Sequence, residues 1–147
     1  MSGRLYPNTP LLGACTAIWR GDRVLLALRS RAPNADKWAM PGGMVEAGET
    51  LAQAAIREVR EETQLVIENP IFNRFHEIIR HDAENRIELH IVLAMFAARH
   101  EHGADAVAGD DAADVGWYTL EDAARLPLTP QTEIFLRESL DLLAAPV

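Results

Sequence analysis

Residues 43–65 read GMVEAGETLAQAAIREVREETQL, and this stretch decides the fold because a glycine-containing loop leads directly into a strongly patterned helix. Thr50 and Gln53 form a capping-box pattern, and residues 51–63 contain neither glycine nor proline. We therefore predict a helix over residues 51–63. The preceding Pro-Gly-Gly at residues 41–43 predicts an irregular loop, in which backbone groups can approach a ligand closely.

The predicted helix has three distinct faces when successive residues are placed about 100° apart. The core-facing side is apolar and consists of Ala52, Ala55, Ile56, Val59 and Thr63. The opposite side is polar, faces water and consists of Gln53, Arg60 and Gln64. A third stripe runs beside the apolar side and carries three carboxylates together with the small residue Ala54, which leaves space next to them.

The carboxylates of this stripe are Glu58, Glu61 and Glu62. Three such groups within two helical turns repel one another unless cations join them. One interpretation is an ordinary solvated face. The other is a hard-oxygen site for Mg²⁺ or Mn²⁺ that holds phosphate oxygens, and the glycine loop and the position beside the core favour it.

Apolar runs on both sides of this stretch predict strands. We expect a hairpin of residues 12–19 and 24–28 around Gly21-Asp22, a short strand at 65–67, and a second hairpin of residues 71–80 and 87–97 around Asp82–Asn85. We then expect a polar loop at 100–111, a strand at 115–118, a short helix capped by Thr119 and a final helix opened by Thr129-Pro130. This order predicts an α/β fold in which a mixed sheet lies between helices.

Length and composition favour one globular domain. The chain has 147 residues, of which 48% are hydrophobic and 24% charged. The single cysteine, Cys15, excludes a disulfide framework, and its apolar strand indicates a buried small residue. The net charge of −8 argues against a nucleic-acid polymer as partner. Because we find neither a signal peptide nor an apolar run of membrane-spanning length, we expect a cytoplasmic protein without a membrane partner.

The stretch at residues 43–65 resembles the signature of the Nudix hydrolases, G-x5-E-x7-R-E-U-x-E-E-x-G-U, where U is a bulky apolar residue. The matching residues are Gly43, Glu49, Arg57, Glu58, Val59, Glu61, Glu62 and Leu65. Gln64 stands where the family has glycine. Because this position follows the helix, we expect a left-handed backbone there, at a cost of about 1 kcal/mol for a glutamine.

The resemblance extends over about residues 12–143 and implies a Nudix-type α/β/α sandwich. Residues 1–147 are then a single Nudix hydrolase domain, with residues 1–11 as an N-terminal extension. Members of the family often form homodimers, so the resemblance leaves a homodimer open for this chain.

The resemblance also implies roles for the matching residues. Glu58 and Glu62 are expected to bind Mg²⁺, or Mn²⁺, with Glu61 as a third carboxylate ligand and the Gly42 carbonyl as a further donor. Glu49 and Arg57 resemble the family's orienting ion pair, which supports the ligands. The alternative for this pair is an ordinary surface salt bridge.

Catalytic and substrate-binding candidates also lie outside the signature. Asp111 resembles the loop carboxylate that acts as base or extra metal ligand in the family, and Asp110, Glu101 and Asp105 are alternatives on the same loop. Arg29 resembles a position that contacts substrate phosphate, although a solvated strand end would look the same.

Among the histidines, His81 is a candidate for the substrate cleft. The other four, including His76, lack the paired spacing of metal ligands on a helix. We interpret them as solvated or strand residues.

The function that the resemblance implies is metal-dependent hydrolysis of a pyrophosphate bond in a nucleoside diphosphate linked to another group. ADP-ribose, or a similar nucleotide-sugar giving AMP and a sugar phosphate, is the leading substrate. The first alternative is a nucleoside triphosphate pyrophosphohydrolase that removes oxidised nucleotides. The second is a Nudix-fold sensor that binds a nucleotide without hydrolysing it.

Overall fold

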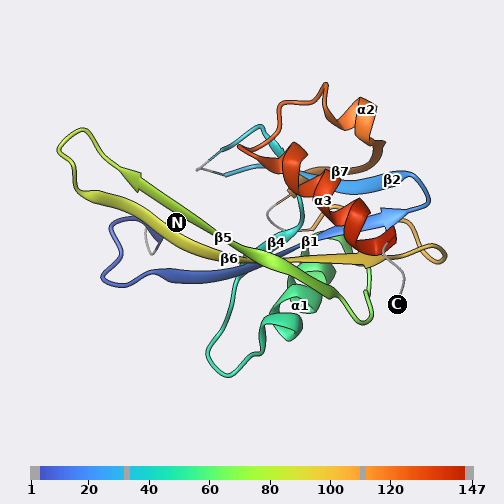
Figure 1. Ribbon diagram of the computed structural model, residues 1–147, viewed down its shortest axis with the longest axis horizontal. Helices are drawn as coiled ribbons and strands as arrows, with labels where there is room; N and C mark the ends of the chain where they lie inside the picture. Colours follow the sequence, from blue (N-terminus) through green and yellow to red (C-terminus); the bar gives the residue numbers. More distant parts are fainter. Residues whose placement is uncertain (1–3, 32–33, 110–111, 145–147) are drawn as a thin grey trace.

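The structure, a computed structural model, describes residues 4–31, 34–109 and 112–144 (Figure 1). Its elements are β1 (Leu11–Arg20), β2 (Arg23–Arg29), β3 (Trp38–Ala39), β4 (Gly42–Met44), α1 (Leu51–Thr63), β5 (Ile71–His81), β6 (Ile87–Arg99), β7 (Ala112–Thr119), α2 (Leu120–Ala123) and α3 (Thr132–Ala144). No helix among these residues has the length and apolar character needed to cross a membrane.

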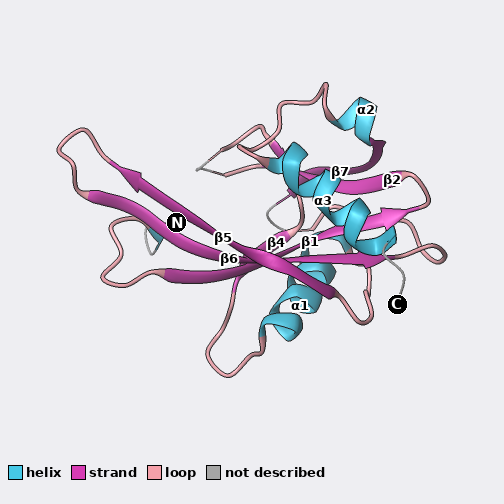
Figure 2. Cartoon of the chain, viewed as in Figure 1, coloured by secondary structure: helices cyan, strands magenta, loops and turns pink. Residues whose placement is uncertain are grey.

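In the described part of the chain, seven strands form one mixed sheet. The central strand β1 pairs in parallel with β6 and antiparallel with β2 and β4. β5 pairs with β6 at one edge, and β7 pairs with β2. The predicted fold class, a mixed sheet between helices, is confirmed, and Figure 2 shows the helices on both sides of the strands.

The alternation of side chains along β1 builds a separate core on each face of the sheet. Ala17 and Trp19 pack with Leu136 of α3 on one face, whereas Ile18 packs with Val59 of α1 on the other. Figure 1 accordingly shows α1 below the sheet and α3 above it. The two helices thus fix the sheet from opposite sides.

Three predictions of secondary structure were wrong in detail. Residues 41–43 were predicted as an irregular loop, but Gly42 and Gly43 belong to β4, which pairs with Gly13–Cys15 of β1. Residues 65–67, predicted as a strand, are not a strand; Leu65 and Ile67 are buried in the core with Ile18, Leu25 and Val59 without joining the sheet. The last helix begins at Thr132 rather than at Thr129-Pro130, because Gln131 has a left-handed backbone with φ of 65°.

The prediction of α1 is confirmed at both ends. The side chain of Thr50 accepts a hydrogen bond from the Gln53 N–H, and the side chain of Gln53 accepts one from the Thr50 N–H. Gln64 has the predicted left-handed conformation, with φ of 63°. The helical wheel misplaced Ala54, which is fully buried against the sheet beside Ala55 rather than lying open next to the carboxylates.

Candidate active site

The first half of the site is formed where two carboxylates of α1 meet the backbone of β4. Gly42 donates its N–H to Oε2 of Glu62 over 3.3 Å. The carboxylate of Glu58 lies against Gly43, so that a Cβ atom at residue 43 would overlap it. Because residues 58 and 62 are one helical turn apart, both side chains reach the same short strand.

Glycine is required in β4 for two separate contacts. A Cβ atom at Gly42 would collide with the carbonyl oxygen of Ala14 and with Cys15 in β1, and one at Gly43 would displace the Glu58 carboxylate. Gly42 and Gly43, which look like a break in regular structure in the sequence, therefore let β4 pack closely on both β1 and α1.

Arg57 connects the loop before α1 to the helix. Its Nε and Nη2 donate to the two carboxylate oxygens of Glu49 over 2.7 and 2.9 Å, and Nη2 also donates to the Met44 carbonyl over 2.9 Å. Nη1 donates to Glu58 over 2.8 Å and to Glu61 over 3.2 Å. The structure thus shows the predicted Glu49–Arg57 pair as a bidentate bond within a larger network.

The ionisable side chains of this network have pKa values that are shifted in different directions. The hydrogen bonds from Arg57 and from the Glu46 N–H lower the pKa of Glu49 to about 2. Burial raises the pKa of Glu58, and the hydrogen bond from Arg57 only partly offsets this effect. The hydrogen bond to Glu49 in turn raises the pKa of Arg57. Arg57 therefore stays charged, and its hydrogen bond to Glu58 counteracts part of the effect of burial on that carboxylate.

The donor set suits a hard divalent cation. It consists of carboxylate oxygens on one helix face beside the backbone of a Gly-Gly strand, and such oxygens are the ligands that Mg²⁺ and Mn²⁺ prefer. Among the described residues, no three His, Cys, Asp or Glu side chains stand in a metal-binding arrangement. Glu58 and the more exposed Glu61 instead share the Arg57 guanidinium. The predicted ligand set of Gly42, Glu58, Glu61 and Glu62 stays a prediction.

The loop between β6 and β7 is attached to the end of α1. Val107 donates its N–H to the Thr63 carbonyl over 2.9 Å, and Gly109 donates to the Glu62 carbonyl over 2.7 Å. These bonds satisfy carbonyls that a helix end leaves without an intrahelical partner. The loop therefore approaches α1 directly beside Glu62.

The predicted base, Asp111, and its first alternative, Asp110, lie outside the described residues. The other two alternatives are engaged elsewhere. Glu101 accepts a hydrogen bond from the Gly21 N–H, and Asp105 pairs with Arg20, both at the β1–β2 hairpin. Within the described residues, neither of them forms a hydrogen bond or ion pair with the carboxylates of α1.

A cavity of about 460 Å³ forms the second half of the site, on the other side of β4. Its walls are mainly apolar and sulfur-rich, with Met40, Met44, Met95 and Phe135 among the lining residues. Gly42 and Gly43 also line it, so β4 separates the cavity from the carboxylates of α1. Cys15 is confirmed as a buried residue, and burial raises the pKa of its thiol to about 12.

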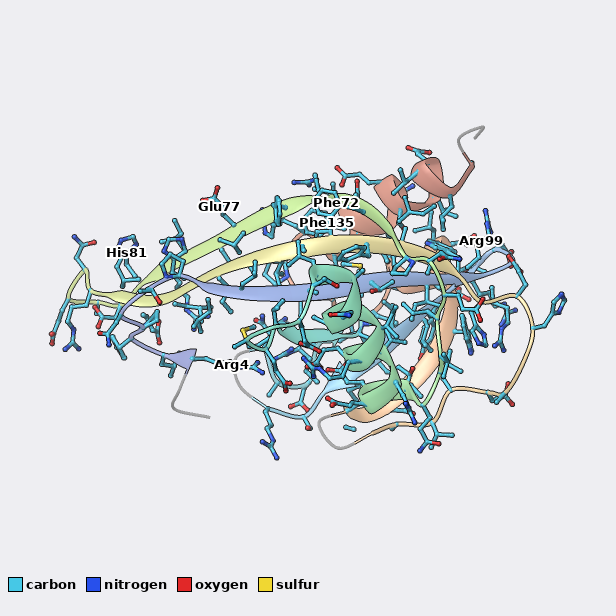
Figure 3. The ribbon with its side chains drawn as sticks, turned by 90° about the horizontal axis from the view of Figure 1, so that it is seen from below. Arg4, Phe72, Glu77, His81, Arg99 and Phe135 are labelled. Carbon is cyan, nitrogen blue, oxygen red and sulfur yellow. The ribbon has the colours of Figure 1, made fainter. Side chains whose placement is uncertain are left out.

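The polar residues of the cavity differ in part from the predicted ones. Arg29 lines it, as expected for a substrate contact. His81 does not, because it lies exposed at the far end of β5 (Figure 3). The histidine in the cavity is His76, whose ring centroid lies 4.9 Å from that of Phe135. The period of two along β5 could have found it, since His76 shares a strand face with Ile78 and Arg80.

Comparisons with known proteins agree with this geometry. A family model described as NUDIX domain matches residues 9–139. An ADP-ribose pyrophosphatase of Methanocaldococcus jannaschii is 29% identical over 124 residues, which cover 84% of this chain and 69% of that protein. The NAD-capped RNA hydrolase NudC of Pseudomonas aeruginosa is 32% identical over 143 residues, covering 97% of this chain and 45% of the enzyme. The chain therefore spans less than half the length of that NudC.

Solved structures share the fold. A MutT NUDIX hydrolase from Burkholderia pseudomallei aligns with a TM-score of 0.74 and 30% identity, covering 89% of this chain and 98% of that one. The NUDIX domain of Shewanella oneidensis NrtR, in complex with ADP ribose, aligns with a TM-score of 0.79 at 22% identity and covers 93% of this chain and 90% of its own. The second likeness shows the fold alone.

Proposed function

Because this chain belongs to the NUDIX family and is a Nudix hydrolase, we propose that it hydrolyses the pyrophosphate bond of ADP-ribose or a similar nucleoside diphosphate linked to a sugar. The products are AMP and a sugar phosphate. The reaction depends on Mg²⁺, with Mn²⁺ as an alternative.

The single observation that carries this proposal is the position of β4 between the carboxylates and the cavity. Gly43 contacts Glu58 and also lines the apolar space of about 460 Å³. A substrate whose phosphates lie near Glu58 and Glu62 can therefore place a nucleoside in the cavity. Carboxylates on one side of β4 and an apolar cavity on the other suit a substrate that is anionic in the middle and less polar at its end.

We assign the following roles to the residues of α1. Glu58 and Glu62 hold the cation together with the Gly42 carbonyl, and Glu61 contributes a third carboxylate. When bound, the ion supplies charge neutralisation of the phosphate oxygens and lowers the pKa of the attacking water. Arg57 fixes the direction of Glu58 through their 2.8 Å bond, and Glu49 fixes Arg57.

We assign the proton transfer and the phosphate contact to residues next to α1. Asp111 follows the loop that Gly109 attaches to Glu62, and we propose it as the base. Arg29 contacts a phosphate from the cavity side. Each of these two roles rests on the resemblance and on the position of the neighbouring backbone.

Within the cavity, His76 and Phe135 form the polar and aromatic end. Burial lowers the pKa of His76, so its imidazole is neutral near pH 7 and can donate or accept a hydrogen bond. A neutral hydrogen-bonding ring beside an aromatic ring suits a nucleobase or a ribose. We therefore place the nucleoside against these two residues.

The names of the relatives indicate which substrates should be tested first. The pyrophosphatase from M. jannaschii acts on ADP-ribose by name, and the NudC relatives act on NAD-capped RNA. Both names describe an adenosine diphosphate linked to a further group, which supports the leading substrate class. Nucleoside triphosphates, the first alternative that the resemblance implies, are the second candidate.

The test is to incubate the protein with Mg²⁺ and ADP-ribose, NAD, ATP, GTP or 8-oxo-GTP, and to separate the products by chromatography. We expect AMP and ribose phosphate from ADP-ribose at the highest kcat/KM. A nucleoside monophosphate and pyrophosphate from a triphosphate at a higher kcat/KM would favour the second candidate. Binding without turnover of any substrate would indicate a sensor instead.

A further inference from the structure

The segment before β1 is attached to the tip of the β5–β6 hairpin by Tyr6. The N–H of Tyr6 donates to the Glu88 carbonyl over 2.8 Å, and its hydroxyl donates to Oδ2 of Asp82 over 2.9 Å. The guanidinium of Arg86 lies 5.1 Å from the centre of the Tyr6 ring. Tyr6 is thus held by a backbone bond, a charged hydrogen bond and a cation–π contact.

The partner of Tyr6 in this contact is itself held rigidly. The carboxylate of Asp82 accepts hydrogen bonds from the backbone N–H groups of Glu84 and Arg86 and from Nε of Arg86. The bonds from the Arg86 backbone and from the other donors lower the pKa of Asp82 to about 2. A carboxylate with this many donors gives Tyr6 a fixed point on the hairpin.

The attachment brings Arg4 to the candidate active site. Two residues before Tyr6, Arg4 lines the cavity together with Gly42, Gly43 and Met44. In Figure 3, Arg4 points from the N-terminal segment toward α1, whereas His81 lies farther out on the hairpin.

Arg4 differs from the neighbouring cation of the cavity wall. Arg80 also lines the cavity, but its Nε is bonded to Glu88 over 3.1 Å. No ion pair found among residues 4–31, 34–109 and 112–144 involves Arg4. Arg4 is thus a cavity-lining cation outside these ion pairs, in a chain with a net charge of −8, and such a cation suits an anionic ligand.

We propose that Arg4 binds a phosphate group of the substrate at the mouth of the cavity, and that Tyr6 is the positioning residue that holds Arg4 there. The N-terminal segment is then part of the substrate site. This inference rests on the proposed function in one respect, namely that the ligand is a nucleoside diphosphate derivative.

The test compares Arg4→Gln with Arg4→Lys and with Arg99→Gln, which removes the same charge near the end of the molecule that lies farther from Arg4 (Figure 3). We expect Arg4→Gln to raise KM for ADP-ribose about tenfold with kcat within twofold, because the contact binds ground state and transition state alike. Arg4→Lys keeps the charge and raises KM less than threefold. Arg99→Gln leaves KM within twofold.

Tyr6→Phe tests the positioning role, because it removes only the hydroxyl that bonds Asp82. We expect KM to rise about threefold in the wild-type background and less than 1.5-fold when Arg4 is already glutamine. An equal effect of Tyr6→Phe in both backgrounds would show that Tyr6 merely stabilises the fold. An unchanged KM in Arg4→Gln would overturn the binding role.

A binding measurement separates this inference from the proposed function. Calorimetric titration of ADP-ribose in EDTA reports Kd without turnover, and we expect Arg4→Gln to weaken it about tenfold. If the wild type binds ADP-ribose but hydrolyses no substrate, the proposed reaction fails while the Kd ratio still decides the role of Arg4. An equal Kd for the two proteins, or no binding by the wild type, would refute the role of Arg4.

Discussion

Replacing Gln64 by glycine should stabilise the protein, and the structure gives the size of the effect. Gln64 ends α1 with φ of 63° and ψ of 4°, its side chain is exposed, and its N–H donates to the Arg60 carbonyl over 2.8 Å. Glycine keeps this backbone bond and removes a left-handed strain of about 1 kcal/mol. Glycine also has more conformational entropy in the unfolded chain, and this offsets part of the stabilisation. We expect a net increase of about 0.5–1 kcal/mol in the free energy of unfolding.

Urea denaturation followed by circular dichroism measures this change, and two variants serve as controls. Gln64→Ala keeps the left-handed strain and should change the free energy of unfolding by less than about 0.3 kcal/mol. Arg60→Gly places glycine in the exposed interior of α1 and should cost about 1 kcal/mol. Turnover should be nearly unchanged in Gln64→Gly. A less stable Gln64→Gly protein would refute the reasoning, because the glutamine side chain would then have a stabilising contact.

Three further predictions follow from the contacts of α1. Gly43→Ala should lower kcat at least ~100-fold while the protein stays folded by circular dichroism, because the added Cβ displaces the Glu58 carboxylate; kcat within threefold of wild type would contradict this contact. Excess EDTA should abolish hydrolysis and added Mg²⁺ should restore it, whereas undiminished turnover in EDTA would exclude a metal-dependent reaction. The pKa of Glu49 is about 2 in the folded protein and is lowered by Arg57, so its stabilising effect is complete above the ordinary pKa of about 4.5 and is lost as the pH falls toward 2. Acid titrations should therefore show a steeper loss of stability between pH 5 and 2 for the wild type than for Glu49→Gln, and equal slopes would contradict the assignment.

The parts of the fold that local signals specify could be predicted from the sequence. Gly21-Asp22 gives the β1–β2 turn and Thr50 with Gln53 gives the start of α1, because each signal acts through its own backbone neighbours. The left-handed conformation of Gln64 followed from its place after the helix. The stripe of carboxylates was likewise visible, since helical periodicity alone places Glu58 and Glu62 on one side.

The parts that depend on contacts distant in sequence could not be predicted in this way. Gly42 and Gly43 look like a break in regular structure, and only their packing against β1 and α1 shows why they form a strand. Leu65 and Ile67 are apolar and buried like strand residues, but burial alone does not provide a pairing partner. Arg4 reaches the cavity through Tyr6 and Asp82, which are 76 residues apart in the chain.

The central claim is that the carboxylates of α1 hold the metal ion of a pyrophosphohydrolase, and one pair of variants tests it most directly. Glu62 contacts the Gly42 N–H, whereas Arg60 lies exposed on the water-facing side of the same helix. At saturating Mg²⁺ and ADP-ribose, we expect Glu62→Gln to lower kcat at least ~100-fold, or about 2.7 kcal/mol, because it removes the charge that holds the cation. Arg60→Gln should change kcat less than about threefold. If the two variants have the same kcat, the carboxylates form only a charged surface and the metal site lies elsewhere.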